Sequence, residues 1–197
     1  EHDLGVPIDV NGATVWAFNI HHDDEPYQPY QLLGIEYGPA PFIKTEAEAQ
    51  EWANRTRGPA MDLLFADMAA AEGAAAVLVF GDFNEPSGLD WTEAAVAAGQ
   101  HPVKVAWPTT GRLQSAGFVD TYRAAHPDPV AKPAYTWTPQ GDETDPEDHH
   151  DRIDFAFAKA AALEVVGADP GLAEHPALAD AVAVLRSDEH AEFLEKA

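Results

Sequence analysis

The chain has 197 residues, a length that fits one domain with a sizeable hydrophobic core. It carries 34 acidic and 11 basic residues, a formal net charge of −23, which disfavours broad binding of nucleic acid because polyanions are repelled. It contains no cysteine, which excludes disulfides, and no apolar segment long enough to span a bilayer. We therefore expect a single domain over residues 1–197 without a membrane span.

The first predicted strand covers residues 13–21, where apolar residues alternate from Val15 to Ile20 and give way to His21 and His22. We expect His22 to be an ordinary loop histidine. Thr45 and Glu48 form a capping box, which predicts a helix that runs to about residue 72 with a break at Gly58-Pro59. The N-terminal half thus contains a strand that ends in polar groups, followed by a long helix.

A central strand is predicted over residues 74–80, because a run of small and β-branched residues is typical of a strand buried on both faces. Gly81-Asp82-Phe83-Asn84 follows it directly. Side chains alternate along a strand, so the acid and the amide are expected on the same side of the chain. One can hold a hard cation while the other hydrogen-bonds a substrate oxygen. The alternative is a turn in which both side chains bond their own backbone.

Thr92 is expected to cap a short helix that ends at Gly99, and a further helical turn is expected over residues 110–116. Strands are expected over residues 153–158 and 163–168. In the first of these, Asp154 lies between large apolar neighbours and needs a partner, which in the simplest alternative is Arg152 or a buried hydroxyl. Alternating strands and helices favour an α+β fold. We expect the tryptophans at positions 91, 107 and 137 to pack in the core or in a lid rather than to form a ligand platform.

The run over residues 142–151 is rich in Asp, Glu and His and raises the question of a second cation site. Its length does not match an EF-hand loop. The simpler alternative is a solvated acidic loop, because blocks of charge are usually disordered. His149 and His150 stand at the end of this run and are placed to approach a substrate.

Three short motifs resemble the endonuclease/exonuclease/phosphatase family of metal-dependent phosphoesterases. They are Gly81 to Asn84, Arg152 to Phe155 and the strand-ending His21, and the resemblance covers roughly residues 5–165. It implies a four-layer α/β/β/α sandwich of the deoxyribonuclease-like type. Residues 27–32, 86–92, 117–123 and 136–139 are similar to a bacterial secreted branch, which implies an extracellular or periplasmic location.

The resemblance also implies a mechanism, the in-line attack of an activated water on a phosphodiester or phosphomonoester. In it, His21 donates to a non-bridging oxygen, Asp82 and Asn84 orient the nucleophile, and Asp154 orients His190 as the general base. Asp82 and Asp188 would bind Mg²⁺ or Mn²⁺, whereas Ca²⁺ would need more ligands. The substrate is a phosphate ester. DNA is disfavoured by charge unless the active face gathers basic residues, such as those at positions 55, 57, 112 and 123.

The chain departs from the family pattern at both ends. Family members carry an Asn and a metal-binding Glu upstream of the His strand, so the domain looks incomplete at its N-terminus. We expect a companion N-terminal segment, or self-association, to cover the exposed sheet edges. The family's Ser-Asp-His reads here Ser187-Asp188-Glu189-His190, with one residue inserted. In the alternative, one long helix from about residue 176 leaves Asp188 and His190 on the surface.

Two functions follow as alternatives. The first is a metal-dependent phosphoesterase, and the second is a non-catalytic remnant of the same fold that binds a cation or a partner. Composition adds a hypothesis about habitat, since abundant acidic residues with few lysines suit high salt, where charge repulsion is screened.

Overall fold

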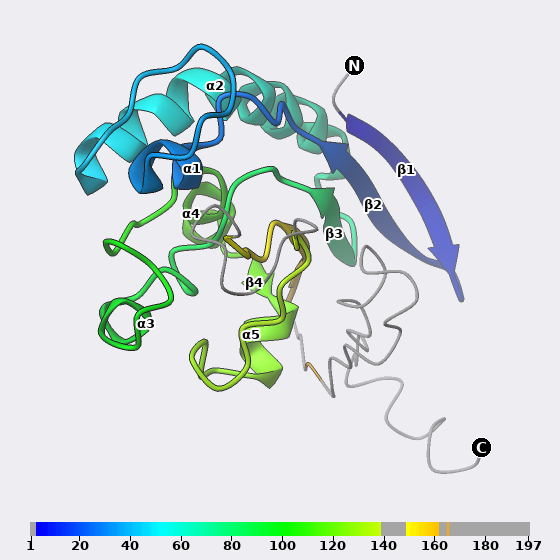
Figure 1. The fold of residues 1–197 in the computed structure, drawn as a ribbon. Helices are drawn as coiled ribbons and strands as arrows, with labels where there is room; N and C mark the ends of the chain where they lie inside the picture. Colours follow the sequence, from blue (N-terminus) through cyan, green and yellow to red (C-terminus); the bar gives the residue numbers. More distant parts are fainter. Residues whose placement is uncertain (1–2, 139–148, 162–164, 166–197) are drawn as a thin grey trace.

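The structure is a computed structural model that describes residues 3–138, 149–161 and 165 (Figure 1). Its centre is a five-stranded sheet in the order β1-β2-β3-β5-β4. The strands are β1 (Asp3–Val10), β2 (Ala13–His21), β3 (Ala76–Asp82), β4 (Val119–Asp120) and β5 (Asp154–Ala160). β2 and β3 run parallel, while the other neighbours run antiparallel. The fold is α+β, as the sequence predicts.

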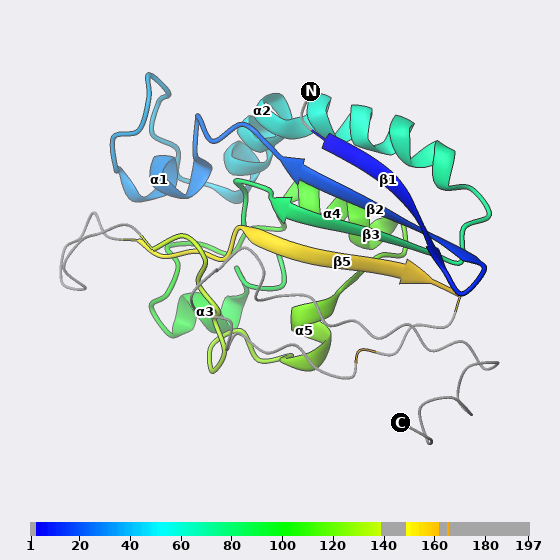
Figure 2. The ribbon, with the colours of Figure 1, turned by 90° about the vertical axis from the view of Figure 1, so that its right-hand side faces the viewer.

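Helices α2 (Glu46–Asp67) and α4 (Pro108–Ser115) cover one face of this sheet (Figure 2). The other helical elements are α1 (Gln28–Leu33), the 3₁₀ turn η1 (Met68–Ala71), α3 (Glu93–Ala97) and α5 (Thr121–Ala125). Met61 and Leu64 of α2 and Leu113 of α4 pack on Phe18 and Phe157 of the sheet to form the main core. In the described part of the chain, no helix is both long enough and apolar enough to cross a membrane.

The long helix α2 begins as predicted. Thr45 accepts a hydrogen bond from the backbone N–H of Glu48, and the Glu48 carboxylate accepts from the backbone N–H of Thr45. The expected break at Gly58-Pro59 is wrong, because α2 continues through Pro59 to Asp67. Buried residues lie on both sides of the proline, so tertiary packing outweighs the hydrogen bond that proline removes.

Strand β1 is absent from the sequence-based prediction, although its signal is present. Asn11-Gly12 joins β1 to β2 with φ of 53° and 86°, the left-handed geometry of a two-residue hairpin turn. The β1 residues Leu4, Val6, Ile8 and Val10 share one face, and Leu4 is 65% exposed. The hairpin therefore presents an apolar row on the face of β1 that it shares with Ala17 and Val15 of β2.

Strand β3 lies two residues later than predicted, and it is not buried on both faces. Val79 packs in the core beneath the helices, whereas Phe80 points to the opposite face and is 37% exposed. The strand extends to Asp82 because Gly81 and Asp82 pair with both β2 and β5. Its polar end is thus held by a neighbour on each side.

Candidate functional site

The ends of three neighbouring strands bring the predicted polar residues together. His21 of β2 lies opposite Asp82 of β3 in the parallel register, and Asp82 lies opposite Asp154 of β5 in the antiparallel register. The Nε2 atom of His21 is 3.7 Å from Oδ2 of Asp82. The side chains of residues 21, 82 and 154 therefore lie side by side at one edge of the sheet.

Asn84 reaches the same place through a turn rather than through strand alternation. β3 ends at Asp82, and Asn84 has a left-handed backbone with φ of 47°. The Asp82 carboxylate accepts a hydrogen bond from the Asn84 backbone N–H (2.8 Å), while the Asn84 side-chain Nδ2 donates to the carbonyl oxygen of His22 (2.8 Å). The turn alternative thus holds for Asp82 alone, because the Asn84 side chain bonds the distant end of β2 and not its own backbone.

These strand ends open into a cavity of about 460 Å³. It is lined by polar and aromatic side chains, namely His21, His22, Asp23, Asp24, Tyr27, Tyr30, Tyr37, Asp82, Asn84, Trp137 and Ile153. Asp154 is not among the lining residues and lies beside the cavity through its pairing with Asp82. The cavity is large enough to hold a small phosphate ester.

One expectation about the cavity wall needs correction. His22 is a buried wall residue rather than an ordinary loop histidine, and its ring lies edge-on to Phe83. Trp91 and Trp107 are fully buried, as the sequence predicts. Trp137 is 39% exposed and lines the cavity, and its indole N–H donates to the Tyr30 hydroxyl. Of the two expected positions, core or lid, it therefore does not take the core.

The two neighbouring carboxyl groups both have raised pKa values. Burial, and next to it the negative charge of Asp154, raise the pKa of Asp82 to about 6, against the lowering effect of the Asn84 backbone N–H. Burial also raises the pKa of Asp154, while Thr136 and His21 lower it. The Thr136 hydroxyl oxygen accepts from the backbone N–H groups of Ile153 and Asp154 and so holds the start of β5. A site with this excess of negative charge favours a cation.

At the rim of the cavity, Tyr37 donates to the Asp24 carboxylate over 2.6 Å. This hydrogen bond is the main cause that raises the pKa of Tyr37 to about 12 and lowers the pKa of Asp24. Asp24 therefore stays ionised and adds to the negative charge of this edge. The rim is more suited to a cation or a neutral group than to a second phosphate.

Arg152 does not pair with Asp154, so that part of the alternative is wrong, whereas the hydroxyl partner is present in Thr136, whose side-chain hydrogen bond lowers the pKa of Asp154. The Arg152 guanidinium donates to Asp120 (2.6 Å) and to Asp90 (3.0 Å), and Arg123 also contacts Asp90. All four side chains are buried, and Arg152 lies over the Phe155 ring. The network fixes the entry into β5 and leaves the Asp154 carboxylate directed to the end of β3.

A second buried pair supports the loop after Asn84. Glu85 accepts hydrogen bonds from the backbone N–H and the hydroxyl of Thr109 in α4, at 2.8 and 2.7 Å. Its carboxylate lies 3.8 Å from Arg57 of α2, which also donates to Gln28. Sequence reasoning considered Arg57 only as a basic residue that could lie on the active face, and it assigned no role to Glu85. The signal in the sequence was Glu85 itself, which directly follows Asn84, because a charged residue is unusual in a buried segment.

Some predicted residues cannot be placed. Asp188, His190, the strand expected over 163–168 (apart from residue 165) and most of the acidic run lie outside the described residues. The end of that run is described, and there His149 is largely buried and Asp151 fully so. For His149 and Asp151, the solvated-loop alternative is therefore wrong.

The comparisons with known proteins agree with these motifs. The endonuclease/exonuclease/phosphatase family model matches residues 12–188, so the chain belongs to this family. An uncharacterized protein of Caenorhabditis elegans is 40% identical over 93 residues, which is 44% of this chain and 29% of that protein. The chain therefore spans less than a third of this relative.

Solved structures with a similar arrangement are distant in sequence. The Neisseria 3′ phosphatase NExo, bound to a product DNA hairpin, is 18% identical with a TM-score of 0.48, and the match covers 89% of this chain and 61% of that one. The 3′–5′ exonuclease NExo of Neisseria meningitidis is 18% identical with a TM-score of 0.47, over 85% of this chain and 60% of that one. A truncated Caenorhabditis elegans TDP2 is 17% identical with a TM-score of 0.38, over 81% and 49%.

Proposed function

We propose that the chain is a metal-dependent phosphoesterase that hydrolyses a phosphodiester or phosphomonoester by in-line attack of an activated water. The observation that carries this proposal is the convergence of His21, Asp82, Asn84 and Asp154 at adjoining strand ends beside the cavity. Family membership supports the same reaction class.

The residues present fit a hard divalent cation such as Mg²⁺ or Mn²⁺. Asp82 offers carboxylate oxygens as ligands. Burial and the negative charge of the neighbouring Asp154 raise the pKa of Asp82, and a bound cation would offset this negative charge. We propose Asp82 as one ligand and, from the family resemblance, Asp188 as another. When bound, the ion would neutralise charge on the phosphoryl oxygens and lower the pKa of a water molecule.

The protein's own side chains take the remaining roles. His21 is exposed at the cavity mouth and would donate to a non-bridging phosphoryl oxygen. Asp82 and Asn84 would orient the attacking water, and the bond from Asn84 to the His22 carbonyl fixes the plane of its amide. Asp154, which does not pair with Arg152, would position the imidazole of His190 as general base.

The substrate is proposed to be a small phosphate ester rather than long nucleic acid. Arg57 and Arg123 are buried in ion pairs, while Arg55 pairs with Glu51 and Arg112 with Asp62. In the described part of the chain, these arginines therefore do not supply a basic surface beside the cavity. The Tyr and Trp side chains of the wall suit a substrate with an apolar or aromatic group next to the phosphate.

The test is Mg²⁺- or Mn²⁺-dependent hydrolysis of bis(p-nitrophenyl) phosphate. Asp82→Ala and Asn84→Ala should abolish the release of p-nitrophenol, while Asp62→Asn on the exposed side of α2 should leave it unchanged. An absence of turnover, even when an N-terminal companion segment is supplied, would support the alternative of a non-catalytic, cation-binding or partner-binding remnant.

We further propose that residues 1–197 form one domain whose β1 edge and apolar row are covered by a companion N-terminal segment or by a second copy. The support is the exposure of Leu4, Val6 and Ile8 on an edge strand. Analytical ultracentrifugation that finds a monomer at all concentrations would contradict self-association. Membership of a bacterial secreted branch, with an extracellular or periplasmic location, is proposed from the family resemblance alone.

A further inference from the structure

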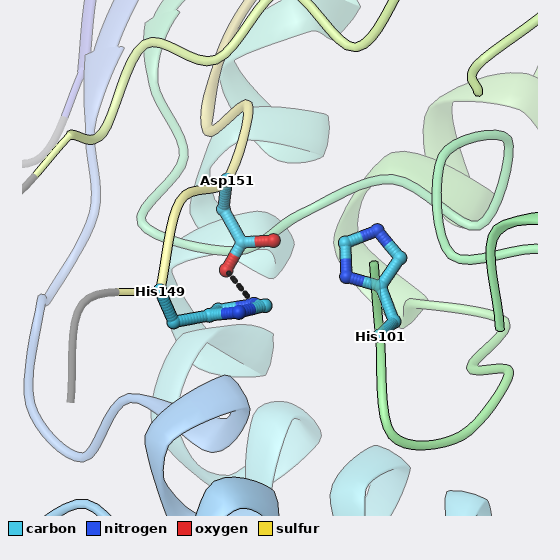
Figure 3. A group of neighbouring side chains, drawn as sticks. All are labelled: His101, His149 and Asp151. Atoms are coloured by element: carbon cyan, nitrogen blue, oxygen red, sulfur yellow. Dashed lines mark ion pairs between the residues drawn. The ribbon is translucent and has the colours of Figure 1, made fainter. Parts of the chain in front are cut away.

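A cluster of two histidines and one aspartate lies apart from the strand ends (Figure 3). His101 belongs to the loop after α3, while His149 and Asp151 belong to the segment that leads into β5. Each residue offers one ligand atom, and these atoms lie within 4.8 Å of one another. The Nε2 atom of His149 is 3.2 Å from Oδ2 of Asp151, which is close to the separation of two ligand atoms on one tetrahedral ion.

No hydrogen bond to Nδ1 from the described part of the chain accounts for the burial of His101. It is only 8% exposed, its ring stacks on Trp91 with centroids 4.2 Å apart, and its Nδ1 atom has no hydrogen-bond partner among the described residues. Figure 3 shows a ring nitrogen of His101 turned toward Asp151 and His149. A buried nitrogen without a partner costs about 1–3 kcal/mol, so the site lacks something that would accept its lone pair.

The Asp151 carboxylate is held by hydrogen bonds from neighbouring side chains, as metal-binding carboxylates usually are. It is 1% exposed, and its two oxygens accept hydrogen bonds from the Trp91 indole N–H (2.8 Å) and the Tyr27 hydroxyl (2.7 Å). Such outer donors fix the orientation of the carboxylate and are typical of metal sites. The carboxylate is thus oriented toward His149 and His101 by groups that do not themselves bind an ion.

We propose that His101, His149 and Asp151 bind one divalent transition-metal ion of the Zn²⁺ class. Two imidazole nitrogens and one carboxylate oxygen match the ligands of such an ion, whereas Mg²⁺ prefers oxygen alone. The proposal concerns a second site, distinct from the one at Asp82, and it does not depend on the proposed hydrolysis.

The ion would have a structural role. Asp151 pairs through its backbone with Trp137, and both Trp137 and Tyr27 line the cavity. An ion that joins the loop of His101 to residues 149–151 would fix the segment that places Asp154 at the end of β5. The site would therefore hold the cavity wall in place without contacting the substrate.

The test is a titration of the chelator-treated, full 197-residue chain with Co²⁺ in an excess of Mg²⁺, which fills the oxygen site proposed at Asp82. The visible absorption of Co²⁺ reports the coordination of the ion, and competition with Zn²⁺ follows. We expect one Co²⁺ ion per chain. His101→Phe keeps a ring against Trp91 and removes both nitrogens, so it should raise the dissociation constant by more than about 100-fold. Tyr27→Phe removes only an outer hydrogen bond and should raise it by about 10–100-fold.

Three controls make the result specific. His126→Phe removes a histidine elsewhere and should not change the titration, and neither should Asp82→Asn, which alters the proposed hydrolytic site. Near-ultraviolet circular dichroism checks that each variant is folded, and His149→Gln replaces His101→Phe if the latter is not. Saturable binding that survives the loss of both histidines, or binding that only Asp82→Asn abolishes, would overturn the proposal, as would no binding at all.

Discussion

The Asp82 carboxyl group lies beside Asp154 in a partly buried site, and its pKa is raised to about 6 from 3.8. A carboxyl group whose pKa is higher in the folded protein favours folding when it is protonated. Its contribution to stability is therefore fully present below pH 3.8 and is lost as the pH rises through about 6. At neutral pH, in the absence of a cation, the ionised group destabilises the fold.

We predict that Asp82→Asn stabilises the metal-free chain while it abolishes hydrolysis. The amide keeps an oxygen to accept from the Asn84 N–H, and it removes the buried charge. The free energy of unfolding, measured with urea, should rise by up to about 3 kcal/mol at pH 8, and the gain should shrink as the pH falls toward 4. Asp62→Asn serves as the control. An equal effect at both pH values would show that the charge of Asp82 is not the cause.

At Asn84, backbone and side chain can be separated. Its φ of 47° suits Asn or Gly, whereas Ala is strained there by about 1–2 kcal/mol. Asn84→Gly should therefore preserve the turn better than Asn84→Ala, although both lose the amide that donates to the His22 carbonyl. We predict that both variants lose hydrolysis of bis(p-nitrophenyl) phosphate and that the alanine variant unfolds at lower urea. Activity in the glycine variant would show that the amide is not required.

The sequence placed some site residues and missed others for a physical reason. His21, Asp82 and Asp154 stand at the ends of apolar patterns, so their convergence follows from local alternation and the ordering of strands, whereas Asn84 reaches the site through a turn. Their supports come from far along the chain. Glu85 meets Thr109, and Asp151 meets Tyr27 across 124 residues, and no local pattern predicts such contacts.

Strand β5 enters the sheet through Arg152, whose buried guanidinium joins Asp90 and Asp120. Removal of one member of a buried ionic network leaves the others without compensation. We predict that Arg152→Met lowers the free energy of unfolding by about 3–5 kcal/mol, measured with urea. Arg55→Met on α2 removes an exposed pair with Glu51 and should change it by less than about 0.5 kcal/mol. Similar effects of the two changes would contradict the proposed role of the network.

The predictability of the elements follows their length and pattern. β2 and the start of α2 match the prediction because alternation and a capping box are local signals. α1 and α5 were missed because they are too short to show periodicity and are held by tertiary contacts. Strand pairing then decides where β3 ends, which shifts that strand by two residues.

The whole molecule carries a net charge of −23, so its charges repel one another at low ionic strength. Salt shortens the screening length from about 10 Å at 0.1 M to about 3 Å at 1 M. We predict that NaCl over this range stabilises the chain by about 1 kcal/mol, or raises Tm by roughly 2–4 °C in thermal denaturation. Equal concentrations of KCl should act alike if screening is the cause. A stability maximum at low ionic strength would remove the high-salt hypothesis.

Tyr27 belongs to the cavity wall, and its hydroxyl also donates a hydrogen bond to the Asp151 carboxylate. A molecule that displaces Tyr27 on entering the cavity must therefore disturb the carboxylate behind it. The coupling free energy between binding in the cavity and binding at Asp151 is the same whichever occurs first, since thermodynamic linkage is reciprocal. Binding of an ion at Asp151 and binding of a molecule in the cavity are thus coupled through the Tyr27 side chain.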